Sequence, residues 1–132
     1  MPLKLSLKPG EAVIVNGAVL RNGERRGTVL LENHARVLRE KDVLQPDLVR
    51  TADQRVYFAI MQLYLMGEHD GAIYDQVAAA LTAALGDAAT DEQRNQLLDI
   101  SRACACGEIY QALSACRRYM KAVQAKDGVS HG

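Results

Sequence analysis

Side chains that could bind an anion are concentrated near the N-terminus. On one predicted strand, Lys4 and Lys8 share a face with Ser6, and five arginines follow within the next 31 residues. Guanidinium groups suit bidentate contacts with phosphate and with guanine edges, so convergence on one rim would form an RNA-binding edge. The alternative is a solvated strand face whose cations protect a sheet edge. The candidate RNA-binding residues are Lys4, Ser6, Lys8, Arg21, Arg25, Arg26, Arg36 and Arg39.

Other reactive side chains do not form a recognisable catalytic or metal site. Cys104 and Cys106 lie two residues apart on a predicted helix, roughly 200° around its axis, so they cannot readily bind the same metal ion as a pair. They are expected to be buried structural thiols. The histidines at 34, 69 and 131 lack metal-motif spacing and are expected at the surface. The acidic cluster Glu68, Asp70 and Asp75 fits a solvated helix entry. We therefore expect no enzyme, no metal and no cofactor.

Composition and charge describe an ordinary globular chain with an uneven charge distribution. Of 132 residues, 48% are hydrophobic and 24% charged, which fits one domain or one domain with a small appendage. Residues 1–50 hold nine basic and six acidic residues, 51–100 two and eight, and 101–132 five and two. This asymmetry suggests an anionic partner for one end, or arises by chance.

The chain is expected in the cytoplasm. It shows no signal peptide or membrane segment, and its three cysteines form no disulfide framework.

The first 39 residues have the pattern of short antiparallel strands. Leucines and polar residues alternate over residues 3–8, Pro9-Gly10 predicts a turn, and further strands are expected at 11–15, 18–21, 26–32 and 35–39. The Asn16-Gly17 and Asn22-Gly23 pairs predict hairpin corners because Asn and Gly tolerate positive φ. The expected structure is an antiparallel β-meander of about five strands. Such a small sheet must pack on helices or on another copy of itself.

About four helices are expected to follow, which makes the fold class α+β. Thr51 and Gln54 have capping-box spacing before the largely apolar run 56–66, and Thr90 and Gln93 repeat that spacing before a helix to about 106. A helix over 72–85 would stop at Gly86. The last helix, over 108–125, has a heptad-like apolar seam, and residues 126–132 are expected to fray.

The boundary between the two parts is expected between about residues 39 and 51. This gives a β-rich RNA-binding module over 1–45 and a helical domain over 46–132 that packs or oligomerises. In a competing hypothesis the helices form the working surface, because the apolar helix 56–66 is either central or covered by a partner, and the seam of the last helix needs one. The candidate partner-helix residues are Tyr57, Met61, Tyr64 and Met120.

Three blocks of the sequence resemble the FlbT family of flagellar biosynthesis regulators: MPLKLSLKPGEAVIVNGAVLRNGERR, VLREKDVLQP and RVYFAIMQLYLM. The resemblance covers most of the chain. It implies a post-transcriptional repressor that associates with the 5′ untranslated region of flagellin mRNA and promotes its decay. The implied RNA partner is this mRNA leader. The helices are expected to pair two copies of the chain, or to bind a flagellar protein as an adaptor or chaperone-like module would. Neither DNA nor a membrane is expected as a partner.

The segments KPGEAVIVN and VLREKDVL also resemble the carbon-storage-regulator (CsrA) module, a small dimeric β-protein that binds GGA-containing RNA loops. The resemblance implies RNA contacts from residues 5–8 of the first strand and from Arg39. The pattern has two consecutive basic residues at the end of that strand, where this chain has Leu7-Lys8.

Overall fold

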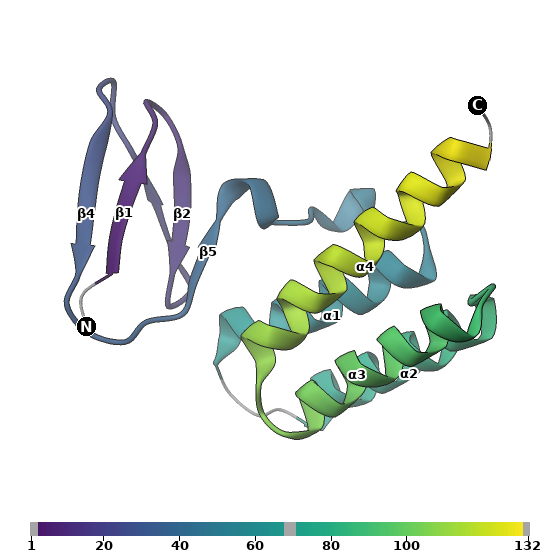
Figure 1. Cartoon of the computed structure of the whole chain (residues 1–132). Coiled ribbons are helices and arrows are strands. Elements are labelled where there is room, and N and C mark those ends of the chain that lie inside the picture. Colours follow the sequence, from purple (N-terminus) through teal and green to yellow (C-terminus); the bar gives the residue numbers. More distant parts are fainter. Residues whose placement is uncertain (1–2, 68–70, 131–132) are drawn as a thin grey trace. The chain divides into compact units, whose positions relative to one another are not determined.

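The computed structural model describes residues 3–67 and 71–130, with side chains as far as residue 125. Five short antiparallel strands precede four helices, which confirms the α+β class (Figure 1). The described residues form two compact units. One is a β unit of residues 3–43 with 65–67, and the other is a helical unit of residues 44–64 with 71–130. No helix of these described residues has the length and apolarity needed to cross a membrane.

The strands of the β unit pair in an order that differs from a meander. Strand β1 pairs antiparallel with β4, and the second sheet has the order β3-β2-β5, again antiparallel. The predicted strand positions are right, but the predicted pairing of sequence neighbours holds only for β2 with β3. The five strands are β1 (Leu3–Leu7), β2 (Ala12–Val15), β3 (Ala18–Arg21), β4 (Gly27–Leu31) and β5 (Val37–Arg39).

The first Asn-Gly pair forms the predicted hairpin corner between β2 and β3. Asn16 has φ 51° and Gly17 has φ 86°, the positive values that a type I′ two-residue turn requires. The turn is also held from outside, because the Asn16 side-chain oxygen accepts the Arg36 backbone N–H at 2.9 Å. This prediction is confirmed.

The second Asn-Gly pair does not form a hairpin, and that prediction is wrong. Neither Asn22 nor Gly23 has positive φ. The Asn22 side-chain amide instead donates to the carbonyl oxygens of Leu7, Lys8 and Arg25 at 3.1, 2.9 and 2.9 Å. An Asn side chain competes with local turn geometry when backbone acceptors are within reach. The chain after β3 is thereby directed to β1, beside which β4 pairs.

The two small sheets of the β unit cover each other's apolar faces. Leu5 and Leu7 of β1 pack with Val13 of β2, and half-buried side chains from β4 and β5 surround them. Because side chains alternate between the two faces of a strand, burial of Leu5 and Leu7 leaves Lys4 and Ser6 on the outer face of β1. The half-buried contributors are Val15, Val29, Leu31 and Val37.

The helices of the helical unit begin where the capping patterns predict. Before α1 (Ala52–Met66), the Thr51 hydroxyl accepts the Gln54 N–H at 3.1 Å and the Gln54 side-chain oxygen accepts the Thr51 N–H at 3.0 Å. Thr90 and Gln93 form the same reciprocal pair before α3 (Asp91–Ala105). Both capping boxes are confirmed.

Two predicted helix ends differ from the structure. Helix α2 (Gly71–Asp87) continues through Gly86, which has no positive φ and so does not act as a left-handed stop. Helix α4 (Ile109–Ser130) continues past the predicted fraying point at Lys126. Short 3₁₀ turns, η1 (Glu40–Asp42) and η2 (Pro46–Leu48), precede the helices.

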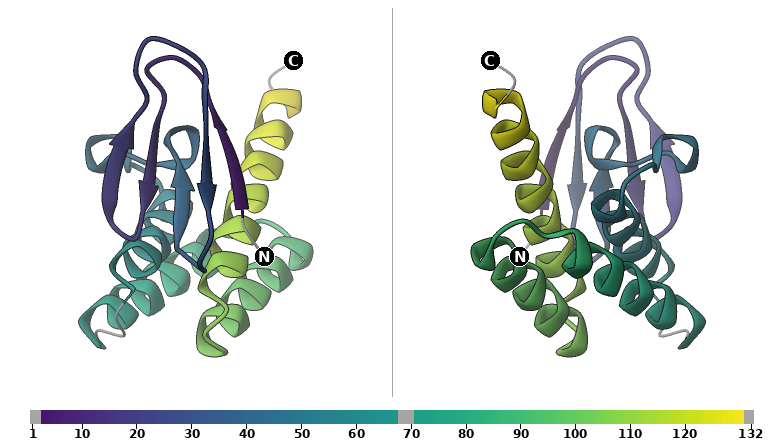
Figure 2. Two further views of the ribbon diagram at one scale, coloured as in Figure 1. Left: turned by 90° about the vertical axis from the view of Figure 1, so that its left-hand side faces the viewer. Right: turned by 90° about the vertical axis from the view of Figure 1, so that its right-hand side faces the viewer.

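Helix α3 packs against both α2 and α4, as both views of Figure 2 show. Helix α1 contributes the fully buried Val56 and Ile60, which confirms that its apolar run is central. The rings of Tyr64 on α1 and Tyr110 on α4 lie 5.4 Å apart between centroids. The seam of α4 is therefore covered within the chain at Leu113 and Cys116, both fully buried.

Candidate nucleic-acid interface

Five of the eight predicted RNA-binding residues are brought to one end of the β unit. This end is formed by the turn that joins β1 to β2 and by the loop that joins β3 to β4, which both lie at the upper end of the β unit in Figure 1. The two segments are bonded together, because the backbone N–H of Gly10 donates to the Gly23 carbonyl oxygen at 2.9 Å. We call the five residues the cationic end: Lys8, Arg21, Arg25, Arg26 and Arg39.

Lys8, Arg25 and Arg26 converge because of Asn22 and of the strand register. The Lys8 and Arg25 carbonyl oxygens both accept from the same Asn22 nitrogen, at 2.9 Å each. The β1–β4 ladder ends with Leu7 opposite Gly27, so Lys8 and Arg26 occupy the next facing positions. All three basic residues are exposed. Within the described residues, no hydrogen bond or ion pair engages their charged groups.

Arg21 and Arg39 belong to the same end but are held by acidic neighbours. The Arg21 guanidinium donates to the Gly10 carbonyl oxygen at 2.7 Å and lies 3.9 Å from Glu40. The Arg39 guanidinium lies 3.4 Å from the Glu11 carboxylate. These two cations are therefore partly neutralised in the free protein.

Lys4 and Ser6 lie on the exposed outer face of β1, the strand that leads into the cationic end. Ser6 stands opposite Thr28 and Lys4 opposite Leu30, both exposed residues of β4. Neither the Lys4 ammonium nor the Ser6 hydroxyl has a hydrogen bond within the described residues. An extended nucleic-acid strand could follow this outer face of β1 from the cationic end. It would meet the polar groups of Lys4, Ser6 and Thr28 and the apolar side chain of Leu30.

Arg36 is not brought to the cationic end. Its backbone bonds Asn16 at the β2–β3 hairpin corner, at the opposite end of the strands. Its half-buried guanidinium occupies the space where a side chain at Gly67 would lie, and Gly67 has φ +68°. The Arg36 Nε is buried and has no hydrogen-bond partner among the residues that the structure describes. We therefore remove Arg36 from the candidate interface.

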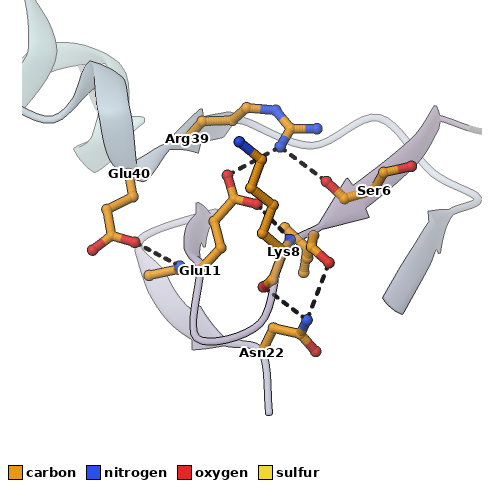
Figure 3. Close-up of polar contacts among 8 residues, drawn as sticks. Ser6, Lys8, Glu11, Asn22, Arg39 and Glu40 are labelled. Atoms are coloured by element: carbon orange, nitrogen blue, oxygen red, sulfur yellow. Dashed lines mark hydrogen bonds and ion pairs between the residues drawn. The ribbon is translucent and has the colours of Figure 1, made fainter. Parts of the chain in front are cut away.

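Glu11, Asn22 and Glu40 organise the cationic end, and sequence reasoning missed all three. Figure 3 shows their contacts. Glu40 directly follows the last residue of β5, and its carboxylate accepts the backbone N–H of Ala12 at 2.8 Å. The Pro9-Gly10 turn was a usable signal for Glu11, because a four-residue turn returns residue 11 to the side of Lys8.

The Glu11 carboxylate is a fixed negative charge among these cations. Its Oε1 accepts the Lys8 backbone N–H at 2.8 Å. This hydrogen bond, together with the charges of Arg39 and Lys8, holds the pKa of Glu11 below its ordinary value of 4.5 despite some opposing effect of burial. Glu11 is therefore ionised at neutral pH.

Two of the predicted partner-helix residues are packed inside the chain. Tyr57 is 2% exposed and Met61 is 5% exposed, so neither can be a docking surface in this structure. The Met61 sulfur also accepts the Leu44 backbone N–H at 3.4 Å. Tyr64 and Met120 are half-buried. The burial of Tyr57 and Met61 is typical of a central helix that is apolar nearly all round. A partner surface on this helix or on the seam of the last helix stays a prediction.

The predicted thiol environment is right for Cys104 and wrong for Cys106. Cys104 is buried, as is Cys116, whereas Cys106 is exposed at the C-terminal end of α3. Two residues of separation place the two thiols on different helix faces, so their burial differs.

Among the described residues, no cluster of His, Cys, Asp or Glu side chains could hold a metal ion. His34 is exposed, as predicted; His69, His131, Glu68 and Asp70 lie outside the described residues.

Comparison with known proteins decides the family. A family model described as "Flagellar protein FlbT" matches residues 3–125. The chain belongs to the FlbT family. One FlbT relative is the flagellum biosynthesis repressor protein of Caulobacter vibrioides strain CB 15, which is 41% identical over 121 residues, covering 92% of this chain and 86% of the relative. No solved structure matches this chain.

Two further FlbT relatives extend over nearly the same region. A probable flagellum biosynthesis repressor of Caulobacter sp. strain K31 is 41% identical, with 92% of both chains covered. A probable repressor of Rhodopseudomonas palustris strain TIE-1 is 30% identical, with 92% of this chain and 94% of the relative covered. Similarity to FlbT proteins thus includes both the β unit and the helices. The resemblance of residues 1–45 to the CsrA module stays a prediction.

Proposed function

We propose that this FlbT-family chain represses flagellum biosynthesis by binding the 5′ untranslated region of flagellin mRNA and promoting decay of the message. Membership of a family whose relatives are named flagellum biosynthesis repressors supports the biological process. The convergence of Lys8, Arg25 and Arg26 at one end of the β unit is the observation that carries RNA as the ligand, since none of their charged groups has a hydrogen bond or ion pair within the described residues.

The cationic end has the chemistry of a site that binds the phosphate backbone of RNA. Lysine and arginine supply charge-assisted hydrogen bonds to phosphate, and guanidinium groups can also contact guanine edges in an unpaired loop. Phosphate contacts fix the position of the RNA, and the few base contacts give selectivity. The outer face of β1, with Lys4 and Ser6, extends this surface along the strand.

Decay of the message does not require chemistry by this chain. A protein that holds the leader RNA can mask ribosome entry or present the transcript to a nuclease from elsewhere. Both routes need only binding. The same proposal includes pairing of two copies of the chain through the helical unit.

A gel-shift titration with purified protein and a flagellin leader transcript tests this function. The triple variant Lys8→Gln, Arg25→Gln and Arg26→Gln removes these three exposed charges while the buried core stays intact. We expect binding to weaken at least tenfold. The slope of log affinity against log salt should also fall by about 0.7 for each phosphate that the variant no longer binds.

A matched triple variant controls for net charge. Arg55→Gln, Arg118→Gln and Lys121→Gln removes three exposed charges from the helical unit instead. This control should retain wild-type affinity within about twofold, and a scrambled transcript of the same length should bind more weakly to the wild type. Equal losses in the two triple variants, or wild-type protein that does not shift the leader, would overturn the proposal.

A further inference from the structure

A single carboxylate lies where the cationic end could hold a phosphate. The turn from Lys8 to Glu11 is closed by the Glu11 N–H, which donates to the Lys8 carbonyl oxygen at 3.0 Å, and Gly10 supplies φ +73°. These features are those of a type II turn with Pro at its second position. The turn directs the Glu11 side chain back over its own start (Figure 3).

The donors around this carboxylate are the ones that bind phosphate oxygens. One carboxylate oxygen accepts the Lys8 backbone N–H at 2.8 Å, and the other lies 3.4 Å from a terminal nitrogen of the Arg39 guanidinium. The Lys8 ammonium adds a second positive charge that acts on Glu11. A backbone amide, a guanidinium and an ammonium together suit any compact oxyanion.

Arg39 is held in place without Glu11. The same guanidinium nitrogen that faces Glu11 also donates to the Ser6 carbonyl oxygen at 3.1 Å. The backbone of Arg39 is fixed by pairing with Val13 in the β2–β5 ladder. If the carboxylate rotates away, the guanidinium therefore stays at the end of β1. Within the described residues its other nitrogens make no hydrogen bond, so they are available to an arriving oxyanion.

We propose that Glu11 is an internal phosphate mimic, which occupies a subsite for one backbone phosphate of the RNA and is displaced when the RNA binds. This inference rests on the proposed function. It makes the Lys8 amide and Arg39 a phosphate subsite that is closed in the free protein. RNA that also binds Arg25 and Arg26 gains enough contacts to displace Glu11 and open the subsite. An isolated phosphate lacks those contacts and must compete with a carboxylate that is attached to the chain.

The variant Glu11→Gln tests the displacement. Its side-chain oxygen can still accept the Lys8 N–H, but the charge that competes for Arg39 is gone. We expect it to bind the flagellin leader transcript three- to tenfold more tightly than the wild type. In an Arg39→Gln background the same substitution should change affinity by less than twofold, because the guanidinium that Glu11 covers is absent.

Glu24→Gln is the matched control for removal of one negative charge. Glu24 is exposed in the loop between β3 and β4, at the same end, and has no hydrogen bond or ion pair within the described residues. Its substitution should raise affinity by less than twofold. If Glu11→Gln binds no more tightly than Glu24→Gln, Glu11 serves to position Arg39 and the inference is overturned.

The pKa of Glu11 provides a second measurement that does not depend on the variant. Carboxyl carbon resonances, titrated by NMR in the free protein and in the RNA complex, should show a higher pKa in the complex, where the Lys8 amide and Arg39 bind phosphate. An unchanged pKa would contradict displacement. Binding by the wild type with no special effect of Glu11→Gln leaves the RNA function standing, whereas no binding by either protein overturns both proposals.

Discussion

The side-chain amide of Asn22 lies 3.1 Å from the carbonyl oxygen of Leu7 and fastens the loop after β3 to the last residue of β1. The same nitrogen serves Lys8 and Arg25, so one side chain assembles the cationic end. Asn22→Ala should lower the local free energy of unfolding of the β1–β4 pair by about 2 kcal/mol, since three carbonyl oxygens each lose the hydrogen bond from Asn22. Amide hydrogen exchange across the β1–β4 ladder measures this.

Asn33 is the matched control for Asn22. It is exposed, lies in the next loop, and has no hydrogen bond within the described residues. Asn33→Ala should leave exchange at the β1–β4 amides unchanged. Equal protection of these amides from exchange in the two variants would show that the Asn22 side chain does not stabilise the β1–β4 pair.

The two-residue turn at Asn16 separates a backbone effect from a hydrogen-bond effect. Asn16→Gly keeps positive φ accessible but removes the acceptor for the Arg36 N–H, whereas Asn16→Ala removes both. Alanine should therefore be the more destabilising by about 1 kcal/mol, the approximate cost of a left-handed conformation with a Cβ. Urea denaturation of the two variants measures the difference. A glycine variant as unstable as the alanine variant would exclude strain as the cause.

The lowered pKa of Glu11 gives acid stability a definite sign. Because the folded-state pKa lies below the ordinary 4.5, the ionised carboxylate stabilises the fold fully above that value, and the contribution disappears as pH falls through the lowered pKa. Wild type should thus be more stable than Glu11→Gln at pH 7, and the two should converge in acid. Thermal unfolding midpoints across pH test this; a difference that grew in acid would contradict it.

The cysteines should react in two distinct classes. Burial raises the pKa of Cys104 to about 11, and burial, followed by the nearby Asp53 and Cys104, raises that of Cys116 to about 12. Cys106 is exposed. At pH 8 a disulfide reagent such as DTNB should modify Cys106 in the folded protein, because the thiolate is the reactive form. The other two should react only on unfolding, and Cys106→Ser should abolish the early phase.

The two Asn-Gly pairs show what sequence could and could not predict about this fold. Both pairs satisfy the local requirement for a hairpin corner. At Asn16 the flanking strands pair with each other and the local signal holds, whereas Asn22 meets the carbonyl oxygens of Leu7 and Lys8 from far along the chain. Strand positions and helix starts depend on local patterns and were predictable. The pairing of β1 with β4 depends on contacts that no local pattern contains.

The candidate interface was predictable as a set of residue types but not as a place. Lys8, Arg25 and Arg26 converge only through the strand register and Asn22. Arg36, of the same type, is carried to the opposite end by its backbone pairing with Asn16. The acidic partners Glu11 and Glu40 were not predicted, because their place between the cations also depends on how distant strands pair.

The non-sequential pairing of the strands sets the order in which the β unit can assemble during synthesis. The β2–β3 hairpin can close as soon as its few residues leave the ribosome, but β1 waits for β4, and β2 lacks its second neighbour until β5 emerges. Pairing over long stretches of chain slows folding because the loop entropy is lost before the paired strands stabilise one another. The first strand made is therefore left unpaired in the nascent chain, and the clustered cations can act together only after the whole β unit has been translated.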